Sequence, residues 1–206
     1  MTVEIVNLEG WMAPDLEASE LACIPMANPD DLLSEADIRA YAEVFPRGFF
    51  VARVDGRPVG MGAGIYLDFD FDHPQHSISG ITGEHQCGNH DPGGEWYYGT
   101  DITVLPEFRG LGIGKILYQH RKDLVIEDGK RGIIAGGSLP GYFHYKDTMP
   151  VDEYVAKVVA GEMRDPTLSF QLANGFEVRG LLENYLEDEA DDGWATLIVW
   201  EVPAPV

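Results

Sequence analysis

Two apolar runs joined by a turn dipeptide stand out in the first third of the chain. Residues 49–54 and 58–68 are rich in apolar side chains, and Asp55-Gly56 between them is typical of a tight β turn. This pattern predicts a β-hairpin. Apolar residues at helical spacing through 31–44 predict an amphipathic helix before the hairpin, and a weak alternation over 3–8 predicts an edge strand.

The rest of the chain predicts a strand–loop–helix–strand unit and four later elements. Aromatic and β-branched residues favour a strand at 95–104, an apolar stripe favours a helix at 115–127, and 132–138 has the pattern of a short buried strand. Asp165 is suited to cap a helix, and a proline follows it at the first helical position. The later elements are helices at 151–162 and 166–174 and strands at 176–179 and 194–202.

The segment 69–94 has no sustained periodicity and is longer than an ordinary connection. Its histidines and cysteine do not match zinc-binding spacings, so we expect a functional lid and no metal site. These residues are His73, His76, His85, Cys87 and His90. With 206 residues and 45% apolar composition, the chain predicts one domain over 1–206, in which 1–30 form an N-terminal extension.

The formal net charge of −21 argues against nucleic acid and anionic lipid as partners, because both need clustered Lys and Arg. The same field attracts a cationic substrate such as an amine. Cys23 and Cys87 lie in unlike contexts and are expected to be reduced thiols. The chain has no apolar run of membrane-spanning length and starts without a basic or apolar leader, so we expect a cytoplasmic protein with no membrane partner.

Glycine recurs at every second position after the predicted strand 95–104, in the stretch Arg109-Gly110-Leu111-Gly112-Ile113-Gly114-Lys115. Glycines let the backbone turn sharply and present successive amide groups, and the following helix adds the positive end of its dipole. Arg109 and Lys115 add positive charge to this turn in an otherwise acidic chain. The stretch therefore predicts a site for phosphate groups.

Two nucleotide-binding motifs fit the same stretch poorly. A Walker loop has Ser or Thr after its Gly-Lys pair, whereas Ile116 follows Lys115. In a dinucleotide-binding fingerprint the third glycine comes later, because Gly114 follows Gly112 one residue too soon. A nucleotide-binding protein that uses this loop stays an alternative, and tighter binding of ATP or NAD than of CoA would support it.

The run from Arg109 to Gly114 resembles the cofactor motif of the GNAT superfamily of acyl-CoA-dependent N-acyltransferases: Arg or Gln, two residues, Gly, one residue, Gly or Ala. The resemblance extends over the order of elements in 31–176 and implies a mixed α/β fold with a mostly antiparallel central sheet flanked by helices. It implies that backbone groups of Ile102, Thr103 and Val104 hold the pantetheine arm of acetyl-CoA or another acyl-CoA. Residues 109–115 would hold the pyrophosphate. Homodimers are common in the family, so the resemblance allows for one.

The chain departs from the family pattern at the general acid. Many relatives carry a Tyr four residues before a Gly-Phe pair, whereas this chain has Gln171 four residues before Gly175-Phe176. Another hydroxyl could serve in its place. The candidates are Tyr142, Tyr145 and Tyr185, and Tyr185 is the one retained.

A general base is also needed, because an ammonium group must lose a proton before its nitrogen can attack a thioester. Strand alternation places Glu95, Tyr97 and Asp101 on one face, opposite Ile102 and Val104. Asp101 and Glu95 are the candidate bases. An amide in the strand near Val104 is the candidate oxyanion donor.

The expected reaction is direct transfer of an acyl group, acetyl in the first place, from CoA to a primary amine in a ternary complex. The acceptor is expected to be a small-molecule amine. The alternative is a non-catalytic acyl-CoA-binding or regulatory domain, which the glutamine at the acid position would permit. Residues 165–186 also resemble acetyltransferase domains fused to nitrilase-type amidohydrolases in some bacteria.

Overall fold

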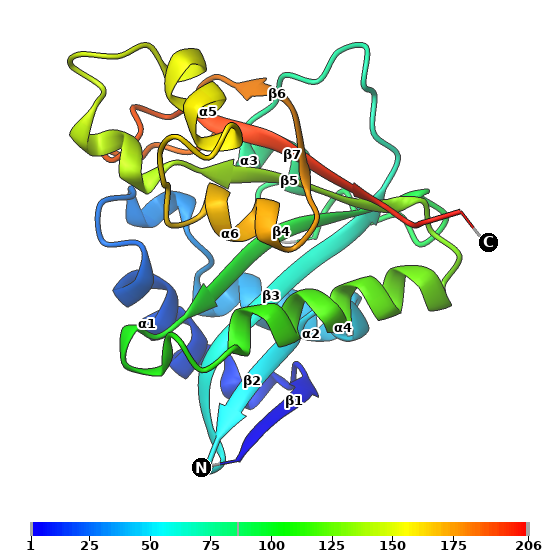
Figure 1. Cartoon of the computed structure of the whole chain (residues 1–206). Coiled ribbons are helices and arrows are strands. Elements are labelled where there is room, and N and C mark those ends of the chain that lie inside the picture. Colours follow the sequence, from blue (N-terminus) through cyan, green and yellow to red (C-terminus); the bar gives the residue numbers. More distant parts are fainter. Residues whose placement is uncertain (1, 86, 205–206) are drawn as a thin grey trace.

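A seven-stranded sheet forms the centre of the protein, with its strands in the order β1-β2-β3-β4-β5-β7-β6 (Figure 1). The computed structural model describes residues 2–85 and 87–204. Neighbouring strands are antiparallel, except that β4 and β5 are parallel. The strands are β1 (Val3–Asn7), β2 (Phe50–Val54), β3 (Arg57–Leu67), β4 (Trp96–Val104), β5 (Gly132–Ser138), β6 (Glu177–Leu182) and β7 (Ala195–Glu201).

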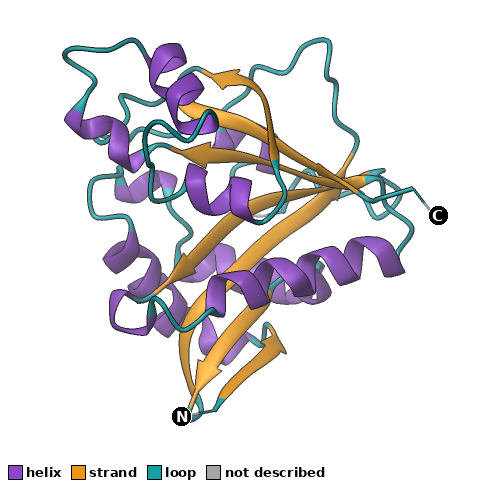
Figure 2. Ribbon diagram, viewed as in Figure 1, coloured by secondary structure: helices purple, strands orange, loops and turns teal. Residues whose placement is uncertain are grey.

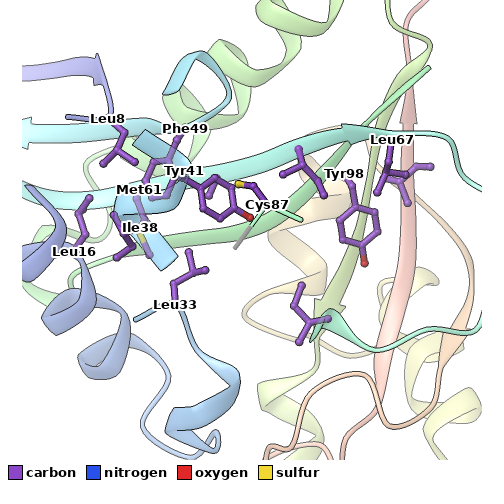
Figure 3. Close-up of a cluster of buried hydrophobic side chains, with 14 of the residues drawn as sticks. Leu8, Leu16, Leu33, Ile38, Tyr41, Phe49, Met61, Leu67, Cys87 and Tyr98 are labelled. Atoms are coloured by element: carbon purple, nitrogen blue, oxygen red, sulfur yellow. The ribbon is translucent and has the colours of Figure 1, made fainter. Parts of the chain in front are cut away.

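Helices cover both faces of this sheet and confirm the mixed α/β fold (Figure 2). One buried apolar cluster packs under α1 (Ala13–Cys23), α2 (Glu35–Val44) and α3 (Ile78–Thr82). The other packs under α4 (Ile113–Glu127), α5 (Val151–Val159) and α6 (Leu168–Ala173). Figure 3 shows the first cluster, in which Leu16, Ile38 and Met61 interlock and Tyr41 lies beside Cys87. Within the described ranges, no helix is long and apolar enough to cross a membrane.

The predicted elements are present, with bounds set by local capping. The hairpin β2–β3 turns at Asp55-Gly56, where both residues have positive φ. α2 begins at Glu35, four residues later than predicted, because Ser34 and Asp37 form a reciprocal capping box. α1 was not predicted, since buried polar side chains such as Glu20 interrupt its apolar stripe.

Candidate active site

The strands β4 and β5 part at their C-terminal ends and leave an opening in the sheet. They pair only from Trp96 to Gly99 and from Gly132 to Ala135. β3, in contrast, follows β4 as far as Val104. Residues 100–104 therefore have an unpaired edge on the side facing β5, and the two strands diverge in Figure 1. We call this opening, between 100–104 of β4 and 136–138 of β5, the fork.

The segment predicted to hold pantetheine, Ile102 to Val104, lies on the unpaired edge of the fork. Backbone groups that point to such an edge have no partner in the sheet, although the Val104 carbonyl accepts from the Arg109 side chain. These three residues lie at the fork, and their contact with a cofactor stays a prediction.

A bulge in β4 decides which way Asp101 points. Ala63 of β3 pairs with Asp101 and Gly64 pairs with Gly99, so Thr100 is an extra residue without a partner. The extra residue reverses the alternation of side chains. Tyr97 packs in the cluster under α4, whereas the Asp101 carboxyl lies on the α1 side beside Glu20. The prediction that Tyr97 and Asp101 share a face is therefore wrong.

Glu95 lies apart from the fork. It precedes β4 at the other end, six residues from Asp101, which corresponds to roughly 20 Å along a strand. Its carboxylate is 60% exposed and pairs with Arg131 at 3.1 Å. The structure therefore does not bring the two candidate bases together, and Glu95 has no part in the proposal below.

The glycine-rich stretch turns from the end of β4 into α4. Gly110 and Gly112 have φ of +79° and +80°, a region that other residues rarely adopt, and Gly112 is the N-cap of α4. A Cβ on either glycine would meet no atom within 4 Å, so their surroundings are open. Gly114 serves packing instead, because a Cβ there would come 2.9 Å from the Phe170 ring of α6. The first amides of α4 have no helical partner and are available to an anion.

The other side chains of the stretch divide between anchors and exposed groups. Arg109 donates from Nε to the carbonyl of Val104 at 2.9 Å and so ties the turn to the end of β4. Ile113, the first residue of α4, is buried, whereas Leu111 and Lys115 are exposed. The predicted contacts of Arg109 and Lys115 with phosphate remain predictions.

A buried glutamate, Glu20 of α1, faces Asp101 across the fork. Glu20 is fully buried, and the Asp101 carboxyl lies within hydrogen-bonding reach of it. Burial raises the pKa of Glu20 well above its usual value, and the negative Asp101 raises it further. Both effects favour the neutral, protonated form of Glu20. No sequence pattern indicated this residue, because it lies in the segment 1–30, which matched no known motif.

On the α4 side, the buried Arg121 holds the bulge. One of its terminal nitrogens donates to the carbonyls of Ala63, at 2.7 Å, and Asp101. Its guanidinium carbon lies 5.7 Å from the ring centroids of both Tyr97 and Tyr118. Among the described residues, no carboxylate lies within 4 Å of it. The arginine stabilises a backbone bend rather than an ion pair.

Tyr185 is the one candidate acid that reaches the fork. Its ring packs over Gly136, the first residue of β5 beyond the ladder with β4. Its hydroxyl oxygen lies 3.1 Å from that of Tyr98. Burial raises the pKa of Tyr185, and the negative Asp101 adds to the rise. Tyr142 instead donates to the Met149 carbonyl, and Tyr145 packs against Tyr154.

Gln171 of α6 closes the fork on the α4 side. It is 3% exposed, and its amide group abuts Gly137 of β5, where a Cβ would collide with it. Its Oε1 has no hydrogen-bond partner. The residue at the position where many relatives carry a tyrosine therefore offers an unpartnered carbonyl oxygen to the fork.

The fork has the unsatisfied polar groups that a polar ligand needs. In the described part of the chain, four buried side-chain atoms have no hydrogen-bond partner, and two of them, on Thr103 and Gln171, lie at the fork. Unpartnered buried polar atoms cost about 1–3 kcal/mol each and mark places where a ligand or water belongs. These atoms are Glu20 Oε2, Thr103 Oγ1, Arg121 Nε and Gln171 Oε1. The arrangement fits the amide and thioester groups of an acyl-CoA arm.

The histidines and the cysteine of 69–94 point in different directions. His85 and Cys87 are buried, and burial raises the pKa of the Cys87 thiol to about 12. His90 stacks on Phe45 and accepts from the amide of Tyr66. His76 approaches Tyr98. Over 2–85 and 87–204, no group of three His, Cys, Asp or Glu side chains is placed to hold a metal ion.

An acidic pocket of about 400 Å³ lies next to Tyr185, between the start of α3 and the β6–β7 loop. One cation already sits at its rim, since Lys146 donates to the Glu189 carbonyl at 2.7 Å and pairs with Asp192 at 2.6 Å. The pocket therefore has the charge to attract an ammonium group. Its acidic lining residues are Asp31, Glu187, Asp188, Glu189 and Asp192.

Comparison with known sequences gives a family match and two relatives in Bacillus subtilis. The model described as "Acetyltransferase (GNAT) family" matches residues 13–138. YkwB, named an uncharacterized N-acetyltransferase, is 31% identical over 202 residues, which cover 96% of this chain and 89% of YkwB. YhcX, named a probable hydrolase, is 38% identical over 162 residues, or 78% of this chain and 32% of YhcX. The chain thus spans about a third of the length of YhcX.

Solved structures show the same fold over nearly the whole chain. The loading GNATL domain of CurA from Lyngbya majuscula matches with a TM-score of 0.84 and 20% identity, covering 98% of both chains. GphF, a GNAT-like decarboxylase in complex with isobutyryl-CoA, matches with a TM-score of 0.80 and 22% identity, over 96% of this chain and 98% of GphF. At these identities the likeness concerns the fold alone.

Proposed function

This chain belongs to the GNAT family of acetyltransferases, and we propose that it transfers an acetyl group from acetyl-CoA to a primary amine. Acyl-CoA is the co-substrate. The observation that carries the proposal is the continuity of the site. The glycine-rich turn at the start of α4 comes shortly after the end of β4, and the unpaired edge 102–104 of β4 forms one side of the fork. Asp101 and Tyr185 lie at the same fork.

The residues available to the acyl donor fall into two groups. The first amides of α4 and the exposed Lys115 would hold the pyrophosphate, and the edge of β4 from Ile102 to Val104 would hold the pantetheine arm. The arm supplies the thioester, and Gln171 and Thr103 offer it the unpartnered atoms of the fork. The donor is thereby oriented without help from a charged side chain in the fork itself.

Two residues of the fork divide the proton transfers of the reaction. Asp101 accepts the proton that the amine nitrogen loses as the new N–C bond forms. Tyr185 donates its hydroxyl proton to the sulfur as the C–S bond breaks. The amide of Val104 is the proposed donor to the oxyanion between these events. Both residues lie on the α1 side of the sheet. Burial raises the pKa of Tyr185, and the charge of Asp101 raises it further.

The acidic pocket supports a cationic acceptor. Tyr185 lines this pocket and also reaches the fork, so it joins the two. Amines are protonated at neutral pH, and the five carboxylates of the pocket would draw in such a cation, which loses one proton to solvent before its nitrogen attacks. The proposal also places the protein in the cytoplasm and allows for a homodimer.

Calorimetric titration with acetyl-CoA tests the donor site, with turnover of an amine panel as the second stage. Gly112→Asp should abolish saturable binding, because it strains a φ of +80° and adds negative charge at the start of α4. Gly129→Asp is the matched control at the other end of α4, where φ is +64° and the surroundings are equally open. Absence of binding to the folded wild type would contradict the proposal, and binding without turnover would favour the non-catalytic alternative.

Decarboxylation of an acyl-CoA is a second candidate function. CurA's loading domain and the GphF decarboxylase share the fold at high TM-scores. Gln171 favours this candidate, because loss of carbon dioxide leaves the thioester intact and needs no acid for a departing thiolate. Incubation with malonyl-CoA in the absence of amine separates the two. Formation of acetyl-CoA would establish decarboxylation, and unchanged malonyl-CoA would exclude it for this substrate.

A further inference from the structure

Three side chains form a hydrogen-bonded line from the segment 69–94 to the fork. Nε2 of His76 lies 2.7 Å from the hydroxyl oxygen of Tyr98, which lies 3.1 Å from that of Tyr185. Both tyrosines are buried, and both hydroxyls lie close enough to the amide of Gly136 for it to oppose the rise that burial causes in their pKa. This line of side chains therefore ends at Gly136, where β5 leaves its pairing with β4.

The other side of His76 fixes the direction of these hydrogen bonds. Its Nδ1 lies 2.7 Å from the carbonyl of Pro74, and a carbonyl can only accept, so Nδ1 carries a hydrogen. In the neutral ring Nε2 is then an acceptor, and Tyr98 must donate to it. Tyr98 has one hydrogen, so with the neutral ring Tyr185 donates to Tyr98, whereas donation from Tyr98 to Tyr185 belongs to the ring that carries a hydrogen on Nε2. Burial lowers the pKa of His76, which keeps the ring neutral at neutral pH.

Protonation of His76 would reverse the whole line. With a hydrogen on Nε2, the ring donates to Tyr98, Tyr98 donates to Tyr185, and the hydroxyl hydrogen of Tyr185 is released toward the fork. The same two contacts serve both directions. His76 is only part-buried, so solvent can exchange protons with it.

The surroundings of His76 leave it free of competing charges. The ring packs edge-on against Phe69, Tyr98 and Tyr185, with centroids 5.4–5.7 Å apart. No salt bridge of the described residues involves it, whereas His73 in the same segment pairs with Asp70. The nearest charge to act on the line is that of Asp101, which raises the pKa of both tyrosines in addition to burial.

We propose that His76 is a positioning residue that returns a proton to Tyr185 through Tyr98. This inference rests on the proposed function, in which Tyr185 protonates the departing sulfur. The steps balance: the sulfur takes the hydrogen of Tyr185, Tyr185 takes that of Tyr98, and Tyr98 takes one from Nε2 of His76, which solvent has protonated. The proton lost by the amine leaves through Asp101, so the cycle needs no further reactant. The segment 69–94 thereby takes part in the reaction.

Nitrogen NMR of histidine-labelled protein tests the line without turnover. We expect His76 to carry its hydrogen on Nδ1, and Tyr98→Phe to change the Nε2 signal of His76 while leaving the tautomer in place. Tyr185→Phe should change the same signal less. A neutral His76 with its hydrogen on Nε2 would overturn the proposal, whatever the activity of the protein.

Steady-state kinetics with acetyl-CoA and the best amine of the panel test the proton delivery. Tyr98→Phe keeps the ring and should lower kcat about tenfold or more with KM for acetyl-CoA unchanged, since an acid commonly contributes about 10²–10⁴-fold. His76→Gln should lower kcat similarly and flatten its pH dependence, because an amide can hydrogen-bond but cannot deliver a proton.

His73→Gln is the matched control from the same segment, with a side chain 86% exposed, and should behave as the wild type. Wild-type kcat in Tyr98→Phe and His76→Gln would overturn this inference while leaving the proposed function standing. Absence of turnover by the wild type with every amine would instead count against the proposed function, and the NMR result would still decide the hydrogen-bonded line.

Discussion

Asp101 faces the fork because β4 contains one residue more than its partner. Without Thr100, strand alternation would turn the carboxyl towards α4 and Arg121, away from Tyr185. The hydroxyl of Tyr41 donates to Thr100 at 3.2 Å and helps to keep the extra residue in place on the α1 side. At the scale of single residues, the candidate site depends on a bulge that no hydrophobic pattern reveals.

The pH dependence of stability should expose Glu20. Its pKa is raised above the usual 4.5 in the folded protein, so the folded state holds the proton more tightly than the unfolded chain does. The stability of the wild type therefore falls as pH rises above about 4.5, because only the unfolded chain ionises freely. Glu20→Gln cannot ionise and should gain stability over the wild type as pH rises.

Urea unfolding of the wild type and Glu20→Gln at pH 5 and pH 8 measures this difference. The advantage of the variant should be larger at pH 8. An advantage that does not change with pH would mean that Glu20 is ionised in the folded protein and that its pairing with Asp101 is wrong.

At the scale of elements, the sequence predicted most strands and helices, including α4, but it missed α1. The hairpin and β5 follow from apolar runs and turn residues alone. Arg121 disturbs the pattern of α4, since a buried arginine stands where an apolar residue is expected while Ile116 is 38% exposed. Glu20 does the same in α1. Residues that serve the site weaken the signal by which their own elements are recognised.

Asp165 shows how a predicted cap can do more than end a helix. Its Oδ1 accepts from the amides of Thr167 and Leu168 at 2.8 Å, as an N-cap should, although α6 starts two residues later than predicted. Its Oδ2 accepts from the amide of Gly141 and the hydroxyl of Tyr154. One buried carboxylate thus joins the start of α6 to α5 and to the segment after β5.

Asp165→Ala should lower the free energy of unfolding by about 3 kcal/mol, because it removes the cap and leaves two buried donors unpaired. Asp152→Ala is the control, since Asp152 is an exposed acidic residue in the first turn of α5 and its loss should cost less than about 1 kcal/mol. Denaturant unfolding measures both. Equal losses would mean that the contacts of Asp165 add nothing beyond a helix-dipole effect.

At the scale of the whole molecule, the charge of −21 opposes the approach of an anionic acyl-CoA. Salt screens such long-range repulsion, with a Debye length of about 10 Å at 0.1 M. The association rate of acetyl-CoA should therefore rise with ionic strength, and stopped-flow fluorescence between 0.02 and 0.3 M salt measures it. A rate that falls with salt would mean that the local charges of Arg109 and Lys115 steer the ligand instead.

The short parallel ladder between β4 and β5 has a consequence for protein engineering. It joins two antiparallel blocks, β1–β2–β3–β4 and β5–β7–β6, through only four residue pairs. Each block keeps its own register, and one covalent crossover, residues 105–131, connects them. A chimera could therefore combine the first block of this chain with the second block of a relative, provided that the four pairs and the packing of α4 are kept. Such exchanges would keep the residues proposed for the donor and change the part of the acidic pocket that the β6–β7 loop supplies.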